Sequence, residues 1–522
     1  MGLGKSGAPA QSTRTSGVGL LACVPALTLC GALAALALWR LACVRLGPDP
    51  DTDAYGHYVI ARQLLDTPLN LRIHWVWLPL YHVLLAAGVA AGATLDHVRQ
   101  ANALGATLTP LLSFAILWHR RPRAGNAVDA LVPYLAAALT ALSPIAMQLG
   151  TTGQMEVLFS VLVVLAVALL QTERHALAAL VLGLCVLTRY EAWPIVMAVG
   201  GVLAYRHLYG GRPLSSSSLL TVLLPGACVL GWGTLRWWGG EPWFGFIFDN
   251  QAFAEGALER HTESGWQIRA LGRYLVTVPW LLFGTPVLFS LIGLRRTLAR
   301  EGVWLVAPPL AVLAFLTLTS LTQSQLGLER HFLVLVPFVA TWVAHGVARS
   351  AEALSEAWQR SVRPGLGPGR VANTSFVLLA LLVLGGSVER LETAMQSWQA
   401  VTVAALREQR AVGDYLSSTE PSSLIVCDDA HVEVLSGIDG SRFMRTGVGE
   451  RALPAIVLLS RSRDVYMVGR AVQLAPLGQL GALSYGALDA APDAYAVIHL
   501  RALGPRGGVA DTGFAPISGA AP

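Results

Sequence analysis

Hydrophobic residues occur along this chain in runs of about 20, separated by short links rich in arginine. An α-helix needs about 20 apolar residues to cross a hydrocarbon core about 30 Å thick. The pattern therefore predicts about eleven membrane-spanning helices, near residues 18–39, 101–118, 127–148, 157–171, 176–188, 193–205, 217–235, 274–294, 302–321, 332–348 and 371–386. The first run exceeds the h-region of a secretory signal and further runs follow it, which favours an uncleaved anchor.

Composition agrees with a membrane protein that crosses the bilayer many times. Of 522 residues, 54% are hydrophobic and 13% charged, and the mean hydropathy is +0.54. Soluble domains carry about 25% charged residues, so a soluble enzyme and a disordered chain are excluded. The six cysteines form no CxxC pair and most lie in apolar runs, which indicates neither a metal centre nor a disulfide framework.

The membrane topology explains where the positive charges lie along the chain. Lys5 is the only lysine among 37 basic residues, which indicates the coding bias of a GC-rich bacterium. Most arginines lie in short loops between apolar runs, as the positive-inside rule predicts. The net charge of +5 therefore gives no reason to expect a nucleic-acid partner.

The apolar stretch 76–94 decides which loops face the cytoplasm. If it crosses the membrane, Arg120, Arg121 and Arg123 lie outside. If it is a juxtamembrane or re-entrant helix, and residues 1–17 are a cytoplasmic tail, most loop arginines lie inside. We therefore expect a juxtamembrane helix. Nearly all carboxylates then lie on the extracytoplasmic face, in loops 45–100, 149–156, 236–273 and 322–331.

The composition changes after residue 386. Residues 387–522 contain no further span, and strand-like runs at 423–427, 455–459 and 494–500 alternate with polar or helical stretches. We expect a small extracytoplasmic α/β domain there. The predicted fold is thus an α-helical polytopic membrane domain over 18–386, with a cytoplasmic tail before it and an α/β domain after it, in the inner membrane of a bacterium.

The first outer loop carries three acids immediately before an amphipathic helix. Asp49, Asp51 and Asp53 precede Tyr55 and His57. A carboxylate at this point can cap the helix, which is worth about 1 kcal/mol. It can equally be a general base or a metal ligand at the membrane surface. Both roles remain open.

Further polar residues lie at the outer ends of apolar runs. Glu156 is one residue inside a run, where it either snorkels to the surface or faces a cavity. Arg189 and Glu191 either pair with each other or hold a lipid-linked phosphate, and Arg330 with His331 presents the same choice.

These motifs, in this order, resemble the GT-C glycosyltransferase superfamily. They are an outer-loop acid before x-Y-x-x-Y-x-x-A-R-x-L-L, a W-x-P-L-Y-H helix, an acid opening a span, L-T-R-Y-E, and R-H-F-L-x-x-x-P. Within the superfamily, the bacterial proteins similar to protein O-mannosyltransferases and aminoarabinose transferases look closest. The resemblance covers roughly residues 18–350.

The resemblance implies roles for individual residues. It makes Asp53 the catalytic acid of the first loop, with Asp51 and Glu156 as further catalytic carboxylates. It places Arg189 and Arg330 near the donor phosphate. Arg62, nine residues after Asp53, is expected with them, and the expected substrate-binding residues are Tyr55, His57, His82, Glu191 and His331.

The resemblance also implies the substrates. It predicts transfer of a hexose such as mannose from a polyprenyl phosphate to a hydroxyl of a protein, lipid or polysaccharide. No cofactor is predicted with certainty. Aminoarabinose transferases have Glu-Lys before a proline where this chain has Trp77-Leu78-Pro79, so a divalent metal stays open and no metal site is assigned.

Two other functions compete with this one. An oligosaccharide ligase or polymerase needs a large outer loop with arginines for a diphosphate, and the loop 236–273 with Arg236, Arg260, Arg269 and Arg273 is of modest size. A transporter or flippase typically has internal repeats and charged residues near the midplane. Here the polar residues gather on one face.

Overall fold

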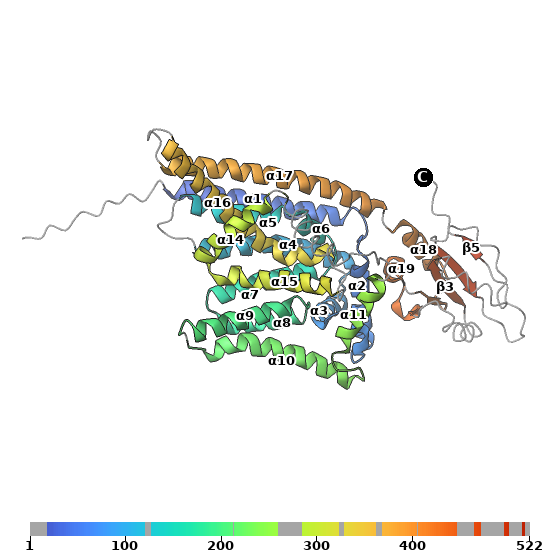
Figure 1. Cartoon of the computed structure of the whole chain (residues 1–522). Helices are drawn as coiled ribbons and strands as arrows, with labels where there is room; N and C mark the ends of the chain where they lie inside the picture. The colour runs from blue at the N-terminus through green and yellow to red at the C-terminus, as the bar shows by residue number, and fades with distance from the viewer. Residues whose placement is uncertain are drawn as a thin grey trace, which may run out of the picture.

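The structure is a computed structural model that describes residues 18–120, 127–211, 213–258, 284, 286–322, 328–361, 368–404, 406–427, 429–445, 464–470, 495–500 and 514–516. Long helices lie side by side with roughly aligned axes, and a small sheet domain lies beyond one end of the bundle (Figure 1). The predicted strand 455–459 and most of the predicted span 274–294 fall outside the described residues, as do Arg260, Arg269 and Arg273.

The bundle contains helices from both halves of the chain. They are α1 (Val18–Val44), α4 (Leu95–Arg120), α5 (Ala127–Ala141), α6 (Pro144–Leu149), α7 (Glu156–Gln171), α8 (His175–Val186), α9 (Ala192–Leu208), α10 (Ser216–Trp238), α14 (Val287–Glu301), α15 (Ala307–Leu321), α16 (Val336–Ser361) and α17 (Pro368–Ala404). The 3₁₀ segments η4 (Val303–Leu305) and η5 (Glu329–Leu335) precede α15 and α16.

Six helical segments of the described chain are long and apolar enough to cross a membrane. They are Ala26–Val44, Leu95–Arg120, Ser216–Trp238, Val303–Leu321, Glu329–Ser361 and Gly369–Trp398. The predicted span 127–148 is two helices, because the chain turns at residues 142–143 and Pro144 begins α6. Helix α17 continues past residue 386, where the composition changes, as far as Ala404. The total of about eleven spans stays a prediction.

Glycines allow α14 and α16 to pack backbone against backbone. A Cβ on Gly293 of α14 would lie 1.7 Å from the backbone oxygen of Trp342. A Cβ on Gly346 of α16 would lie 1.9 Å from the backbone oxygen of Phe289. Small residues at such crossings let helices approach where the membrane provides no hydrophobic drive between them.

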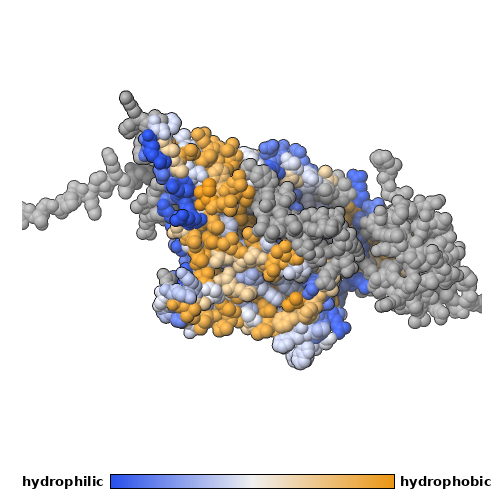
Figure 2. Space-filling model, viewed as in Figure 1, coloured by the Kyte–Doolittle hydropathy of each residue, from blue (hydrophilic) through white to orange (hydrophobic). Residues whose placement is uncertain are grey.

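The outward surface of the bundle is apolar. Figure 2 shows a broad hydrophobic area over the helices. Exposed large side chains include Leu223 and Leu230 on α10 and Leu378, Leu381 and Leu382 on α17. An apolar patch of this size on a monomer marks a membrane or protein contact, and the length of the helices indicates a membrane.

Short elements cover one end of the bundle, which we call the loop end. They are α2 (Thr52–Asp66), η1 (Leu71–His74), α3 (Pro79–Ala90) and α11 (Gly245–Leu258), and they lie between the bundle and the sheet domain (Figure 1). Helix α3 has 12 residues and is therefore about 18 Å long, too short to cross a bilayer. This agrees with the expectation of a juxtamembrane helix at 76–94.

The last part of the chain forms a mixed α/β unit. It contains α18 (Arg407–Ser417), α19 (Ala430–Ser436), the 3₁₀ segment η6 (Gly440–Arg442) and the strands β1 (Leu424–Val426), β2 (Phe443–Met444), β3 (Val465–Arg470), β4 (Tyr495–Leu500) and β5 (Phe514–Pro516). The sheet order is β2-β1-β3-β4-β5, with β2, β1 and β3 parallel and the remaining pairs antiparallel. The runs predicted at 423–427 and 494–500 are strands.

Candidate active site

A cavity of about 510 Å³ opens at the loop end. Five segments line it: the start of α2, the link after η1, the turn before α7, the turn between α8 and α9, and the residues around the start of η5, with α11 along one side. Eight residues singled out in the sequence line this cavity, namely Asp51, Asp53, His57, Glu156, Arg189, Glu191, Arg330 and His331. The structure thus brings together residues that lie far apart in the chain.

Arg189 joins two of the carboxylates. Its Nη1 donates to Glu156 at 2.7 Å, and its Nε and Nη2 donate to the two oxygens of Glu191 at 3.1 and 3.0 Å. The fork geometry of guanidinium suits such bidentate contacts. Burial alone would raise the pKa of Glu191, but Arg189, His331 and hydrogen bonds to the carboxylate together outweigh it and lower that pKa to about 2. Glu191 is therefore an anion that holds Arg189 in place. This ion pair is one of the two roles expected from the sequence for these residues.

Arg330 joins the remaining carboxylates. It forms a close hydrogen bond with Asp53 and lies 3.5 Å from Asp51 and 3.3 Å from Glu156. Burial raises the pKa of Asp51, and Arg330 only partly opposes that shift. At Asp53 burial acts in the same direction, but Arg330 and the other nearby positive groups together outweigh it and the pKa is lowered. Asp53 is therefore the more readily ionised of the two.

Asp51 also caps α2. Its Oδ1 accepts the backbone N–H of Asp53 at 3.0 Å, so the capping role considered for the acidic loop is confirmed. The same oxygen accepts from the side-chain amide of Gln154 at 2.5 Å. Asp51 thereby fastens the start of α2 to the turn before α7 and still lines the cavity.

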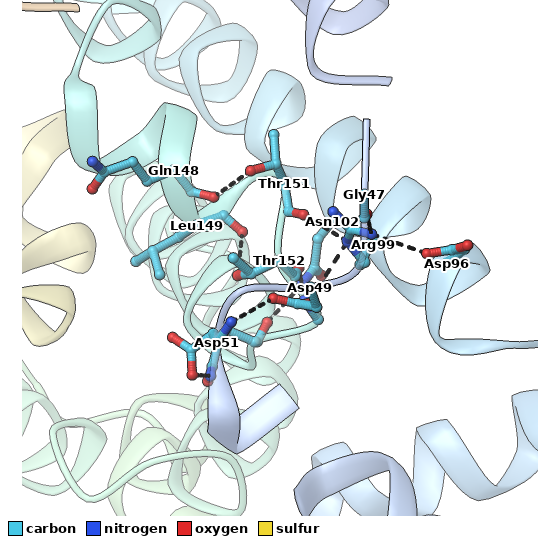
Figure 3. A network of polar contacts seen from close by, with 12 residues as sticks. Gly47, Asp49, Asp51, Asp96, Arg99, Asn102, Gln148, Leu149, Thr151 and Thr152 are labelled. Carbon is cyan, nitrogen blue, oxygen red and sulfur yellow. Dashed lines mark hydrogen bonds and ion pairs between the residues drawn. The ribbon is translucent and has the colours of Figure 1, made fainter. Parts of the chain in front are cut away.

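A buried network behind the cavity fastens the first loop to that same turn (Figure 3). Asp49, 1% exposed, accepts backbone N–H bonds from Asp51 at 3.0 Å and Gly153 at 2.5 Å. Arg99 lies 3.8 Å from Asp49 and donates to the backbone oxygens of Gly47 and Thr151 at 2.8 and 2.9 Å. Burial raises the pKa of Asp49 to about 7, against the lowering effect of Arg99.

Asn102 of α4 completes this network. Its side-chain amide donates to the backbone oxygens of Thr152 at 2.8 Å and Gln154 at 2.7 Å. Three backbone oxygens of the turn before Glu156, those of Thr151, Thr152 and Gln154, are therefore satisfied by Arg99 and Asn102 of α4. The relative positions of Asp51, Asp53 and Glu156 depend on these bonds.

The link between η1 and α3 forms an aromatic wall of the cavity. Trp75 has φ of 48°, a left-handed conformation that is strained for a bulky residue. Arg236 holds it in place by donating to its backbone oxygen at 2.6 Å, and Tyr190 holds the next peptide through Val76 at 2.6 Å. The Trp75 ring meets Phe253 of α11 edge to face at 5.0 Å. Strain of this kind gathers at functional sites.

Three predicted site residues lie outside the cavity lining. Tyr55 packs on His431 of the α/β unit, with ring centroids 4.5 Å apart. Arg62 lies 3.6 Å from Glu433 of α19. His82 lies behind His57 and is hydrogen-bonded to it at 2.9 Å. Their location provides no support for direct substrate contact by Tyr55 or Arg62, which instead connect α2 to the last part of the chain.

Sequence patterns missed several residues that build the site. Arg99 and Asn102 fell at the edge of an apolar run and were not selected, although a charged or amide group there needs a buried partner. Gln154, Trp75 and Phe253 carried no distinguishing signal. Among the described residues, no three His, Cys, Asp or Glu side chains are grouped to hold a metal ion.

No protein-family model matches the sequence, and no curated protein matches it. Solved structures do match. ArnT from Cupriavidus metallidurans bound to undecaprenyl phosphate is 13% identical over 94% of this chain and 100% of that chain, with a TM-score of 0.54. The chain has the fold of ArnT. Its apo structure matches at 13% identity over 92% and 100% of the two chains, with the same TM-score of 0.54.

The apo oligosaccharyltransferase of Archaeoglobus fulgidus is a more remote match. It is 14% identical over 85% of this chain and 70% of that chain, with a TM-score of 0.48. The expected likeness to an enzyme of the ArnT kind is thus confirmed at the level of the fold. At this identity the likeness carries no residue roles, so those rest on the geometry of the cavity.

Proposed function

We propose that this protein is a membrane glycosyltransferase that moves a sugar from a polyprenyl phosphate to an acceptor hydroxyl. The observation that carries the proposal is the cavity at the loop end, where an ionised carboxylate and two guanidiniums converge beside the apolar bundle. The ArnT fold supports the same class of enzyme, since that protein was solved with undecaprenyl phosphate. The sugar is a hexose such as mannose.

Asp53 is the general base of this reaction. The acceptor oxygen attacks the anomeric carbon while Asp53 takes its proton, and the bond from that carbon to the phosphate oxygen breaks. Attack on the face opposite the phosphate inverts the configuration. The ion pair with Arg330 keeps Asp53 deprotonated before the reaction, and its side chain is 29% exposed and open to the cavity. A positioned base of this kind contributes about 10²–10⁴-fold in rate.

Arg189 and Arg330 bind the phosphate. The leaving group is a phosphate monoester that needs electrostatic stabilisation rather than a proton. Both guanidiniums are held by carboxylates in the free protein, so the phosphate replaces one of those contacts. Asp51 is the carboxylate that gives way most readily, because burial has already raised its pKa. Glu156 contacts both arginines and keeps the two guanidiniums in position relative to each other.

The bilayer supplies the lipid part of the donor. A polyprenyl chain remains among lipid tails beside the apolar helices while its phosphate and sugar enter the cavity. We place the cavity on the extracytoplasmic side of the inner membrane, together with the unit after Ala404. Through Tyr55 and Arg62 that unit contacts α2 directly, and it helps to bind a protein, lipid or polysaccharide acceptor.

The proposal is tested with purified protein in liposomes. Radiolabelled polyprenyl-phosphate hexoses are added with candidate acceptors, and the label that leaves the lipid fraction is measured for wild type, Asp53→Asn and Asp66→Asn. Asp66 lies exposed at the end of the same helix and serves as the matched control. Wild type and Asp66→Asn should release label, and Asp53→Asn should release at least about 100-fold less.

Two results would overturn the proposal. One is label that remains on every lipid offered to the wild-type protein. The other is equal release by wild type and Asp53→Asn. Movement of lipid or solute across the bilayer without loss of label would favour a transporter.

A further inference from the structure

Three histidines form a hydrogen-bonded chain that begins at the cavity. His57 Nδ1 lies 2.9 Å from His82 Nε2, and His82 Nδ1 lies 2.8 Å from His74 Nδ1. His57, His82 and His74 are at most 1% exposed. They come from α2, α3 and η1, so the chain also joins three of the four short elements of the loop end.

Burial keeps all three rings neutral at physiological pH. It lowers the pKa of His57 to about 3 and that of His74 to about 4, and it lowers the pKa of His82 as well. A neutral imidazole has one N–H and one bare nitrogen, and the partner of one nitrogen fixes the state of the other. In a chain of three such rings only two proton arrangements satisfy both hydrogen bonds.

The two arrangements differ at the cavity. In the first, His74 Nδ1–H donates to His82, His82 Nε2–H donates to His57 Nδ1, and His57 carries its proton on Nε2. In the second, every proton lies on the other nitrogen and His57 Nε2 is bare. His57 lines the cavity, and its Nε2 is buried with no hydrogen-bond partner among the described residues. A buried polar atom of this kind calls for a partner, which the bound substrate can supply.

Charges at the two ends favour the first arrangement. Asp53, four residues before His57 and on the same face of α2, is the charge with the largest effect on His57. A carboxylate draws the proton towards the cavity end. Arg236 is the charged residue that lowers the pKa of His74, and its positive charge disfavours a proton at the His74 end of the chain. Arg330 and Arg189 act in the opposite direction, and each has a smaller effect on His57 than Asp53 has.

We propose that His57 donates a hydrogen bond from Nε2 to an oxygen of the phosphate–sugar group, and that His82 and His74 are positioning residues that keep the proton on that nitrogen. This inference rests on the proposed function and gives His57, already expected to bind substrate, a specific contact that involves no change of charge. A neutral donor is valuable in this cavity, because both arginines are shared with carboxylates.

Binding measurements test the inference with variants that preserve volume or the donor group. His57→Phe removes the donor, whereas in His57→Gln the amide nitrogen takes the place of Nε2. We expect His57→Phe to weaken binding of the lipid-linked sugar about tenfold, equivalent to about 1.4 kcal/mol, and His57→Gln to restore most of it. His97→Phe, at an exposed site, should bind as the wild type does.

A double-variant comparison tests the chain itself. His74→Phe should weaken binding about threefold, since both arrangements then become populated, and should have no further effect in a His57→Phe background. A merely structural role would instead lower thermal stability and add to the effect of His57→Phe. Binding of sugar-free polyprenyl phosphate locates the contact: equal weakening assigns it to the phosphate, and weakening of the sugar-loaded lipid alone assigns it to the sugar.

The tautomer is also measurable without any ligand. In ¹⁵N spectra of histidine-labelled protein, assigned by comparison with His57→Gln, we expect His57 to be protonated on Nε2 and bare on Nδ1. A bare Nε2, or binding by folded His57→Phe equal to that of wild type, would overturn the inference while the proposed function stands. A wild-type protein that binds no polyprenyl phosphate would refute both.

Discussion

Arg99 ties the first loop of the site to the turn before α7, and replacing it with leucine tests how much the site depends on that tie. The guanidinium is 1% exposed and donates to two backbone oxygens, of Gly47 and Thr151, besides facing the buried carboxylate of Asp49 (Figure 3). Leucine has a similar apolar length but removes every one of these contacts. The backbone oxygens and the carboxylate would then remain buried without their partner.

The expected loss is large. A buried acceptor left without its donor costs about 1–3 kcal/mol, and removing one member of a buried ion pair costs about 3–5 kcal/mol. These contributions overlap, so we expect Arg99→Leu to lower the free energy of unfolding by about 3–5 kcal/mol. The double variant with Asp49→Asn should regain at least about 1 kcal/mol, because without Arg99 the Asp49 carboxyl must take up a proton on folding and asparagine removes that cost.

Reversible unfolding in mixed micelles measures these differences. Arg45→Leu is the matched control, since Arg45 is an exposed arginine of the same loop, and it should change stability by less than about 0.5 kcal/mol. A loss below about 1 kcal/mol for Arg99→Leu, or strictly additive effects of Arg99→Leu and Asp49→Asn, would refute the reasoning.

Three further predictions concern other parts of the molecule. Arg62→Gln should make the last part of the chain more susceptible to limited proteolysis but change the rate of sugar transfer less than about threefold, because Arg62 pairs with Glu433 outside the cavity. A loss of transfer rate of about tenfold or more would instead indicate that Arg62 binds the phosphate. The pKa of Asp49, raised to about 7, means that above about pH 4 the folded state keeps a proton that the unfolded chain has lost. Thermal stability should therefore fall from pH 5 to 8, and it should fall less in Asp49→Asn. Equal slopes of stability against pH in the two proteins would contradict this. Gly293→Leu should prevent α14 from packing on α16 and yield aggregated protein in size-exclusion chromatography, whereas Gly226→Leu, with no atom within 4 Å of its added Cβ, should elute as the wild type does.

The sequence predicts the parts of this fold that depend on local pattern. Apolar runs locate α10 within about three residues and α4 and α15 within about six, and the cap by Asp51 is one of the two roles considered for the acidic loop. Hydropathy alone does not show the turn at residues 142–143, because apolar residues flank it on both sides. Hydropathy also does not show that α17 continues to Ala404, because the helix extends beyond the end of the apolar run.

Contacts between distant residues could be anticipated only where chemistry required a partner. Asp53 and Arg330 meet across 277 residues, and they were expected at one site because both match motifs of the GT-C resemblance. Arg62 was expected there on the same ground and yet pairs with Glu433. In the histidine chain, His57 and His82 are 25 positions apart in the sequence, and His74 and His82 are 8 positions apart. No periodicity of the sequence indicates that these three rings, from separate elements, converge.

The central claim is that one side chain moves the proton while another holds the phosphate, and measuring donor affinity and turnover on the same variants tests it most directly. Asp53→Asn should bind the lipid-linked sugar at least as tightly as wild type, because Arg330 is freed from its carboxylate. Its turnover should fall at least about 100-fold. Arg189→Gln should weaken binding about tenfold or more. If Asp53→Asn loses affinity and keeps its turnover number, or if Arg189→Gln binds as wild type does, the assignment of base and phosphate clamp is wrong.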